Sequence, residues 1–122
     1  MRLLLVEDNF LAGEHLRHVL EGLGHTVIGP VGSVEQGLAI IDAKGVDAAV
    51  LDFAIRGGSA LPIAEALRRR GRPFCFLTGY RDPELIPAGY ARVRRLAKPF
   101  CERELIEALA SFGSGHSPSL GC

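Results

Sequence analysis

The chain has 122 residues, enough for one domain with a buried core but too few for two. Basic and acidic residues balance at 14 each, so no net charge attracts the protein to nucleic acid or to an anionic membrane. The amino-terminal run MRLLLVEDN is too short, and too soon interrupted by acids, for a signal peptide or a membrane span. We therefore expect a cytoplasmic protein without nucleic-acid or membrane partners.

The first half of the chain alternates between predicted strands and helices, assigned from apolar periodicity and capping signals. In chain order we expect a strand at 2–6, a helix capped by Asn9, a strand at 25–29, a helix opened by a Ser33–Gln36 capping box, and a strand at 46–51. The first and last of these strands are continuous apolar runs, typical of strands buried on both faces of a parallel sheet. Both end in acids, namely Glu7 and Asp8 after the first run and Asp52 after the other.

The alternation continues in the second half. We expect a helix over about 60–70 capped by Ser59, a strand at 73–77 ending at Thr78, a short or irregular helix within 79–92, an edge strand at 93–97 ending at Lys98, and a helix over 101–112. Pro83, Pro87 and Gly89 restrict the fourth helix to a turn or two. The predicted domain is residues 1–112, followed by a Gly/Ser/Pro-rich tail at 113–122 that we expect to be disordered.

This order predicts an α/β fold with a five-stranded parallel sheet and right-handed crossovers. All strand carboxyl ends then lie along one edge of the sheet, where open α/β sheets bind their ligands. Four of the five strands bring reactive side chains to this edge. They are Glu7 and Asp8, Asp52, Thr78 and Lys98.

The chemistry of this set predicts a cation and a phosphoryl group. Three gathered carboxylates repel one another unless a cation binds them, and Mg²⁺ takes one or two carboxylates while leaving room for a phosphoryl oxygen. We expect a backbone carbonyl just after Asp52, that of Ala54, to be a further metal ligand. Lys98 and Thr78 supply a positive charge and a hydroxyl for the phosphoryl oxygens. The set therefore favours phosphoryl transfer to a carboxylate, with Asp52 as the nucleophile.

At this point the chain resembles the receiver domain of two-component response regulators, over roughly residues 1–112. The matching segments are LLLVEDN, AAVLD followed by GGSA, FLTGY and AKPF. The resemblance implies that Glu7 and Asp8 hold Mg²⁺, Asp52 accepts phosphate from a phosphohistidine, Thr78 is the switch hydroxyl and Lys98 contacts the phosphate. It also implies a flavodoxin-like sheet of order 2-1-3-4-5 and a cis bond before Pro99.

Two features depart from most receivers. The position three residues before the lysine usually carries an aromatic switch residue, and here it is Arg95. The segment Phe76-Leu77-Thr78-Gly79-Tyr80, followed by a degenerate fourth helix, is similar to the atypical "FAT GUY" receivers, although Leu77 replaces Ala and Tyr80 comes one position early. Tyr80 is therefore a candidate for part of the missing aromatic's role.

The resulting prediction is a stand-alone receiver phosphorylated by a sensor histidine kinase or a histidine phosphotransfer protein. Its output would pass through a downstream protein partner, as a relay, a phosphate sink or a diffusible regulator, and it would not act enzymatically on external substrates. A phosphatase of the haloacid-dehalogenase type needs a second Asp where Ala54 stands. A flavodoxin-like cofactor binder is disfavoured because Glu7 and Asp8 repel phosphate. A third alternative is a pseudo-receiver, which is not phosphorylated and works as an interaction module.

Overall fold

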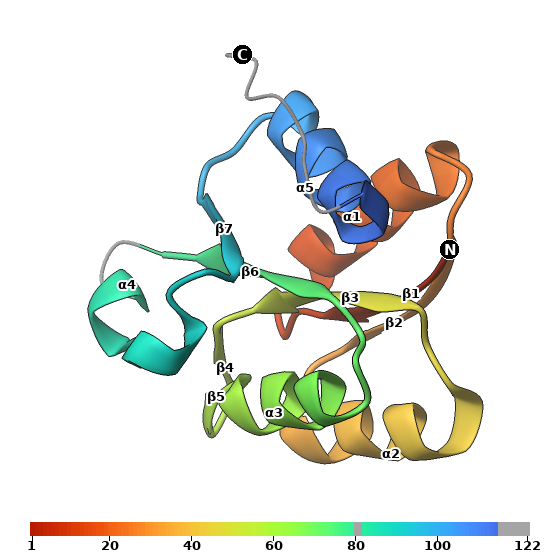
Figure 1. Ribbon diagram of the computed structural model, residues 1–122. Helices are drawn as coiled ribbons and strands as arrows, with labels where there is room; N and C mark the ends of the chain where they lie inside the picture. Colours follow the sequence, from red (N-terminus) through yellow and green to blue (C-terminus); the bar gives the residue numbers. More distant parts are fainter. Residues whose placement is uncertain (80–81, 115–122) are drawn as a thin grey trace.

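The computed structural model describes residues 1–79 and 82–114. It is a three-layered α/β fold, in which a parallel sheet of order β2-β1-β3-β6-β7 lies between helices α1 and α5 on one face and α2 and α3 on the other (Figure 1). The elements are β1 (Arg2–Val6), α1 (Phe10–Gly22), β2 (Thr26–Val31), α2 (Val34–Lys44), β3 (Ala48–Asp52), β4 (Ala54–Ile55), β5 (Gly58–Ser59), α3 (Leu61–Arg69), β6 (Phe74–Thr78), α4 (Asp82–Leu85), the 3-10 helix η1 (Ala88–Tyr90), β7 (Arg94–Ala97) and α5 (Glu102–Ser114). The predicted fold class and strand order are confirmed, with β6 and β7 as the fourth and fifth strands of the sheet.

The core lies on both faces of the sheet. Successive residues of β3 alternate between the two, so that Val50 packs toward α1 and α5 while Leu51 packs toward α2 and α3. Both side chains are fully buried, and burial of one such side chain stabilises the fold by about 1.5–3 kcal/mol. Within the described residues, no helix has the length and apolarity that a membrane span requires.

Side-chain caps fix where the first two helices begin. The Asn9 side-chain Oδ1 accepts the N–H of Ala12 at 2.9 Å, and the Ser33 hydroxyl accepts the N–H of Gln36 at 3.2 Å. The Gln36 side chain accepts from the N–H of Gly32 rather than from that of Ser33, so the predicted capping box is only half formed. These caps satisfy N–H groups that have no partner within a helix.

The segment between Asp52 and α3 differs from the prediction. Instead of a loop it contains the antiparallel ribbon β4–β5, which turns through Arg56 and Gly57, and the φ angles of Gly57 and Gly58 are +88° and +149°. Ser59 belongs to this ribbon, and α3 begins one residue later than predicted, after Ala60. The Ser59 hydroxyl nevertheless accepts the N–H of Leu61, the first residue of α3, at 3.3 Å, so the predicted capping bond is present. The sequence missed the ribbon itself, because two-residue strands are too short to leave a periodic pattern.

The fourth crossover is as short as the prolines predict. It consists of the single turn α4 and the 3-10 helix η1, and no longer helix forms in its described part. Helix α5 continues to Ser114, two residues past the predicted end of the domain. The predicted role of Tyr80 and the predicted disorder of residues 115–122 lie outside the described residues.

Candidate functional site

Strand register brings the predicted site residues to one edge of the sheet. The registered pairs are Val6 with Leu51, Asp52 with Leu77, and Thr78 with Ala97. Glu7 and Lys98 directly follow strands in these pairs, so both emerge beside Asp52 and Thr78. The backbone N–H of Lys98 donates to the Thr78 carbonyl at 2.8 Å, and the bond before Pro99 is cis, as the resemblance implied.

Three carboxylates form the centre of the site. Glu7, Asp8 and Asp52 each offer an oxygen, and these atoms lie within 4.8 Å of one another. Glu7 and Asp52 are only 3 % and 5 % exposed, while Asp8 is half-buried. Buried anionic oxygens of this kind need a compensating cation, and a hard divalent ion such as Mg²⁺ is held by just such oxygen ligands. The donor set therefore fits the predicted metal.

Lys98 contacts two of the three acids. Its Nζ atom donates to Asp52 Oδ2 at 2.9 Å and to Glu7 Oε1 at 3.2 Å. Burial lowers the pKa of Lys98, but the hydrogen bond and the negative charge of Asp52 outweigh that effect and raise it overall. The lysine therefore stays cationic and holds a fixed positive charge next to Asp52.

The two buried acids are shifted in opposite directions. Burial and the hydrogen bond with Glu7 raise the pKa of Asp52 to about 7, against the opposing effect of Lys98. Burial also raises the pKa of Glu7, but hydrogen bonds from Asp52 and from the N–H of Asn9, together with Lys98, lower it overall. Without a metal, the pair of Glu7 and Asp52 therefore takes up a proton more readily than isolated carboxyl groups do, and Asp52 is the member of the pair whose pKa is raised.

Thr78 and Ala54 are the other two residues predicted for the site. Thr78 ends β6 and is almost fully buried at the sheet edge. Ala54 is exposed at the start of the β4–β5 ribbon, two residues beyond Asp52, and the metal-binding role of its carbonyl stays a prediction.

Arg56 is a residue that the sequence argument missed. A cavity of about 380 Å³ opens beside the acids, and Arg56 lines it together with Glu7, Asp8 and Phe10. Its position shortly after Asp52 could have marked it in the sequence. However, only the β4–β5 ribbon shows that the turn with Arg56 faces Glu7 and Asp8. Phe10 is 74 % exposed at the start of α1 and offers an apolar anchor beside the same cavity.

Comparison with known protein families decides the classification. The model of the response regulator receiver domain matches residues 3–110. The chain belongs to this family. No curated protein matches this receiver in a sequence search.

Solved structures of other receivers resemble this one closely. The solution structure of SdrG from Sphingomonas melonis Fr1 is 38 % identical, with a TM-score of 0.81 over 92 % of this chain and 95 % of that one. A BeF3-activated conformation of SdrG, attributed to Pseudomonas melonis Fr1, is 39 % identical, with a TM-score of 0.75 over 90 % and 93 %. The receiver domain of a modulated diguanylate cyclase from Desulfovibrio desulfuricans G20 is 27 % identical, with a TM-score of 0.82 over 93 % and 94 %.

The buried acids predict that neutralising Asp52 stabilises the metal-free protein. Because folding raises the pKa of Asp52 from 3.8 to about 7, its contribution to stability is present below pH 4 and is lost as the pH rises through 7. At pH 8 without Mg²⁺, Asp52→Asn should raise the free energy of unfolding by about 1–4 kcal/mol. The upper figure is the free energy that corresponds to the full pKa shift.

Urea unfolding at pH 4 and pH 8, with and without Mg²⁺, measures this effect. The gain from Asp52→Asn should shrink toward pH 4, where the carboxyl group is neutral in the folded state and partly protonated in the unfolded state. Added Mg²⁺ should stabilise the wild-type receiver more than the variant, since the variant lacks one anionic ligand. If Asp52→Asn is less stable than the wild type at pH 8 without Mg²⁺, the negative charge of Asp52 does not destabilise the metal-free fold, and the prediction is wrong.

Proposed function

We propose that this receiver accepts a phosphoryl group on Asp52 from the phosphohistidine of a sensor histidine kinase or histidine phosphotransfer protein. The reaction is Mg²⁺-dependent and takes place in the cytoplasm, and the signal passes on through contacts with a protein partner. One observation carries the proposal: Lys98 Nζ bonds the same buried Asp52 carboxylate that clusters with Glu7 and Asp8. Positive charge and metal ligands thus surround one nucleophile.

The residues divide the work of the transfer. An Asp52 oxygen attacks the phosphorus, the bond between phosphorus and the imidazole nitrogen breaks, and the imidazole leaves with the electron pair. Lys98 stabilises negative charge on the phosphoryl oxygens, and the Thr78 hydroxyl donates to one of them. Glu7, Asp8 and Asp52, with the Ala54 carbonyl, would hold the Mg²⁺, which would supply positive charge to offset that of the acids and of the phosphoryl group.

A related receiver supports this assignment. SdrG, 39 % identical to this receiver, has a conformation described as BeF3-activated. Beryllium trifluoride attached to a carboxylate has the tetrahedral shape and negative charge of a phosphoryl group. A similar response here requires an aspartate with a neighbouring cation, and Asp52 with Lys98 provides this pair.

The proposal extends to the FAT GUY-type group of receivers. The sequence Phe76-Leu77-Thr78-Gly79 and the short α4 with η1 support it. Arg95 is half-buried on β7, opposite Phe76, where most receivers have the switch aromatic. Activation in this receiver therefore uses an aromatic other than residue 95, for which Tyr80 is the proposed candidate.

Intact-protein mass after incubation with acetyl phosphate and Mg²⁺ tests the proposal. The wild-type receiver should gain the mass of one phosphoryl group, whereas Asp52→Asn should gain none and chelation of Mg²⁺ should abolish the gain. Equal labelling of Asp52→Asn, or no labelling of the wild type, would show that Asp52 is not the phosphoacceptor. The second of these outcomes favours a pseudo-receiver that acts through binding alone.

The downstream role needs a separate experiment. A pull-down with and without BeF3 distinguishes a diffusible regulator, which gains a partner in the activated state, from a pure phosphate sink, which gains none. A relay intermediate should instead pass its phosphoryl group to a histidine phosphotransfer protein. The loss of one phosphoryl mass from the receiver measures this transfer.

A further inference from the structure

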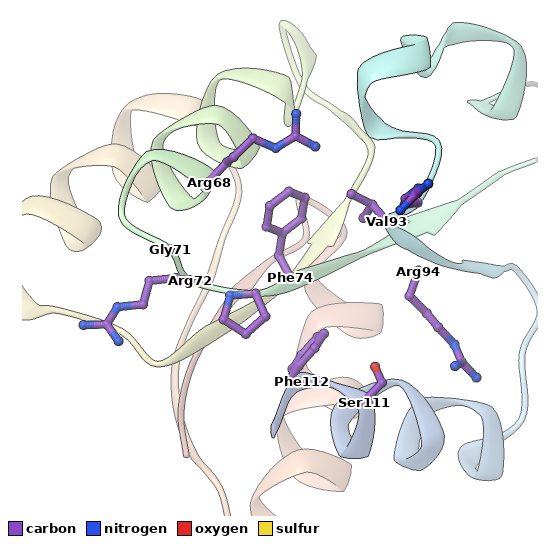
Figure 2. A pocket seen from close by; sticks show the side chains of 10 residues that line it. Arg68, Gly71, Arg72, Phe74, Val93, Arg94, Ser111 and Phe112 are labelled. Atoms are coloured by element: carbon purple, nitrogen blue, oxygen red, sulfur yellow. The ribbon is translucent and has the colours of Figure 1, made fainter. Parts of the chain in front are cut away.

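A groove of about 720 Å³ lies at the end of the sheet opposite the phosphoacceptor site. It is bounded by the carboxyl end of α3, the amino ends of β6 and β7, and the carboxyl end of α5 (Figure 2). Its lining residues are Arg68, Gly71, Arg72, Pro73, Phe74, Arg92, Val93, Arg94, Ser111 and Phe112. Because Phe74 begins β6 and Thr78 ends it, a ligand in this groove leaves the Asp52 edge free.

The groove is strongly basic although the chain as a whole has zero formal charge. Arginines supply all its charged side chains, and none of the described residues lining it is an acid. Arg94 forms an ion pair with Glu107 at 3.3 Å, beside the groove. Within the described part of the chain, Arg72 and Arg92 have no carboxylate partner, and both are exposed. Their charges are available to a ligand.

Arg68 is held in place at the groove without being neutralised. Its guanidinium carbon lies 3.9 Å from the centre of the Tyr90 ring, and it donates to the Gly89 carbonyl at 2.9 Å. A ring face and a carbonyl orient the guanidinium but carry no net charge. A fixed guanidinium loses less entropy when it binds an anion, so Arg68 is a preorganised anchor.

The floor of the groove is apolar. Figure 2 shows the Phe74 ring next to Arg68, with Val93 on its other side, and the Phe112 ring below it beside Ser111. Phe74 is 8 % exposed, and its ring packs on Tyr90 and Phe76 at centroid distances of 6.3 and 5.6 Å. Phe112 and Val93 are half-buried and offer apolar surface to a ligand.

From these observations we infer that the groove binds an acidic peptide segment of a partner protein, with an apolar side chain on the Phe112–Val93 floor and carboxylates on the arginines. Guanidinium groups bind carboxylates in a bidentate manner, which gives the contact direction as well as charge complementarity. This interaction surface goes beyond the proposed phosphotransfer and does not depend on it. A partner can remain bound here while a kinase reaches Asp52.

A nucleic acid fits the groove less well than a peptide. Single strands bind proteins largely by stacking bases on exposed aromatic faces. The Phe74 ring is buried against Tyr90 and Phe76, so it has no free face for a base.

Selection from a random-peptide phage library on the immobilised wild-type receiver tests the proposal. The enriched peptides should combine Asp or Glu with an apolar residue. Their affinity, measured on the synthesised peptides, should fall at least about tenfold on the double variant Arg72→Glu/Arg92→Glu. The control Arg69→Glu/Arg103→Glu makes the same change in charge at two exposed arginines outside the groove and should bind as the wild type does.

Further measurements separate binding in the groove from other effects. Both double variants should unfold at the wild-type temperature and accept phosphate from acetyl phosphate as the wild type does, so a failed groove is distinguishable from a failed phosphoacceptor site. Amide shifts induced by a selected peptide should centre on Gly71, Val93 and Ser111. The proposal is overturned if no acidic peptide is enriched, or if peptide binding survives Arg72→Glu/Arg92→Glu. It is also overturned if the amide shifts centre on Glu7, Asp8 and Asp52. It is also overturned if a labelled mixed-sequence oligonucleotide binds in place of the peptide.

Discussion

Replacing Lys98 with methionine should slow the phosphorylation of Asp52 about 100- to 1000-fold, the loss typical of removing one preorganised charge stabiliser. Lys98 Nζ lies 2.9 Å from Asp52 Oδ2 and bridges to Glu7 in the metal-free structure. When a phosphoryl group reaches Asp52, the ammonium can contact its oxygens as negative charge develops there. Methionine keeps much of the length of the side chain but removes this charge.

Initial rates of labelling by acetyl phosphate, followed by intact mass at saturating Mg²⁺, measure the effect. Saturating metal is needed because the loss of Lys98 also changes the charge around the Mg²⁺ ligands. Arg95→Met is the matched control, since it removes a cation from β7 three residues earlier and should alter the rate less than about twofold. A Lys98→Met rate close to that of the control would show that Lys98 does not assist the transfer.

Much of this site was predictable because parallel strands convert sequence order into spatial order. Four strands, each ending in a polar residue or followed by one, determine the edge to which Glu7, Asp52, Thr78 and Lys98 come. The strand order itself came from the family resemblance, because apolar runs alone do not specify which strands are neighbours. The short fourth crossover was predictable from its prolines, which exclude a long helix.

The features that the sequence did not reveal depend on short or non-local contacts. The β4–β5 ribbon has two residues in each strand, so no periodicity marks it, and the place of Arg56 beside the acids follows from that ribbon. The opposite pKa shifts of Glu7 and Asp52 arise from burial and from a hydrogen bond between residues far apart in the chain. The basic groove joins arginines from separate segments, which the balanced composition conceals.

The strand beside the site contains a glycine that we expect to be irreplaceable. Gly29 lies where the register between β1 and β2 shifts, and its φ of +117° is one that residues with a side chain rarely adopt. A Cβ atom there would lie 2.5 Å from the Leu5 carbonyl oxygen and 3.0 Å from the Val31 nitrogen, both of them backbone atoms. Gly29→Ala should therefore lower the free energy of unfolding by about 2–6 kcal/mol, combining backbone strain and overpacking.

Gly24→Ala separates the two causes. Gly24 also has a positive φ, +95°, but a Cβ atom there meets nothing within 4 Å, so this variant pays for backbone strain alone and should lose about 1–3 kcal/mol. Urea unfolding of both variants gives the difference. Equal losses would show that the contact with Leu5 relaxes without cost.

Because the N–H of Glu7 donates to the Val31 carbonyl at 2.8 Å, a displaced β2 also moves a metal ligand. Gly29→Ala should therefore weaken Mg²⁺ binding, whereas Gly24→Ala, at the far end of β2, should leave it unchanged.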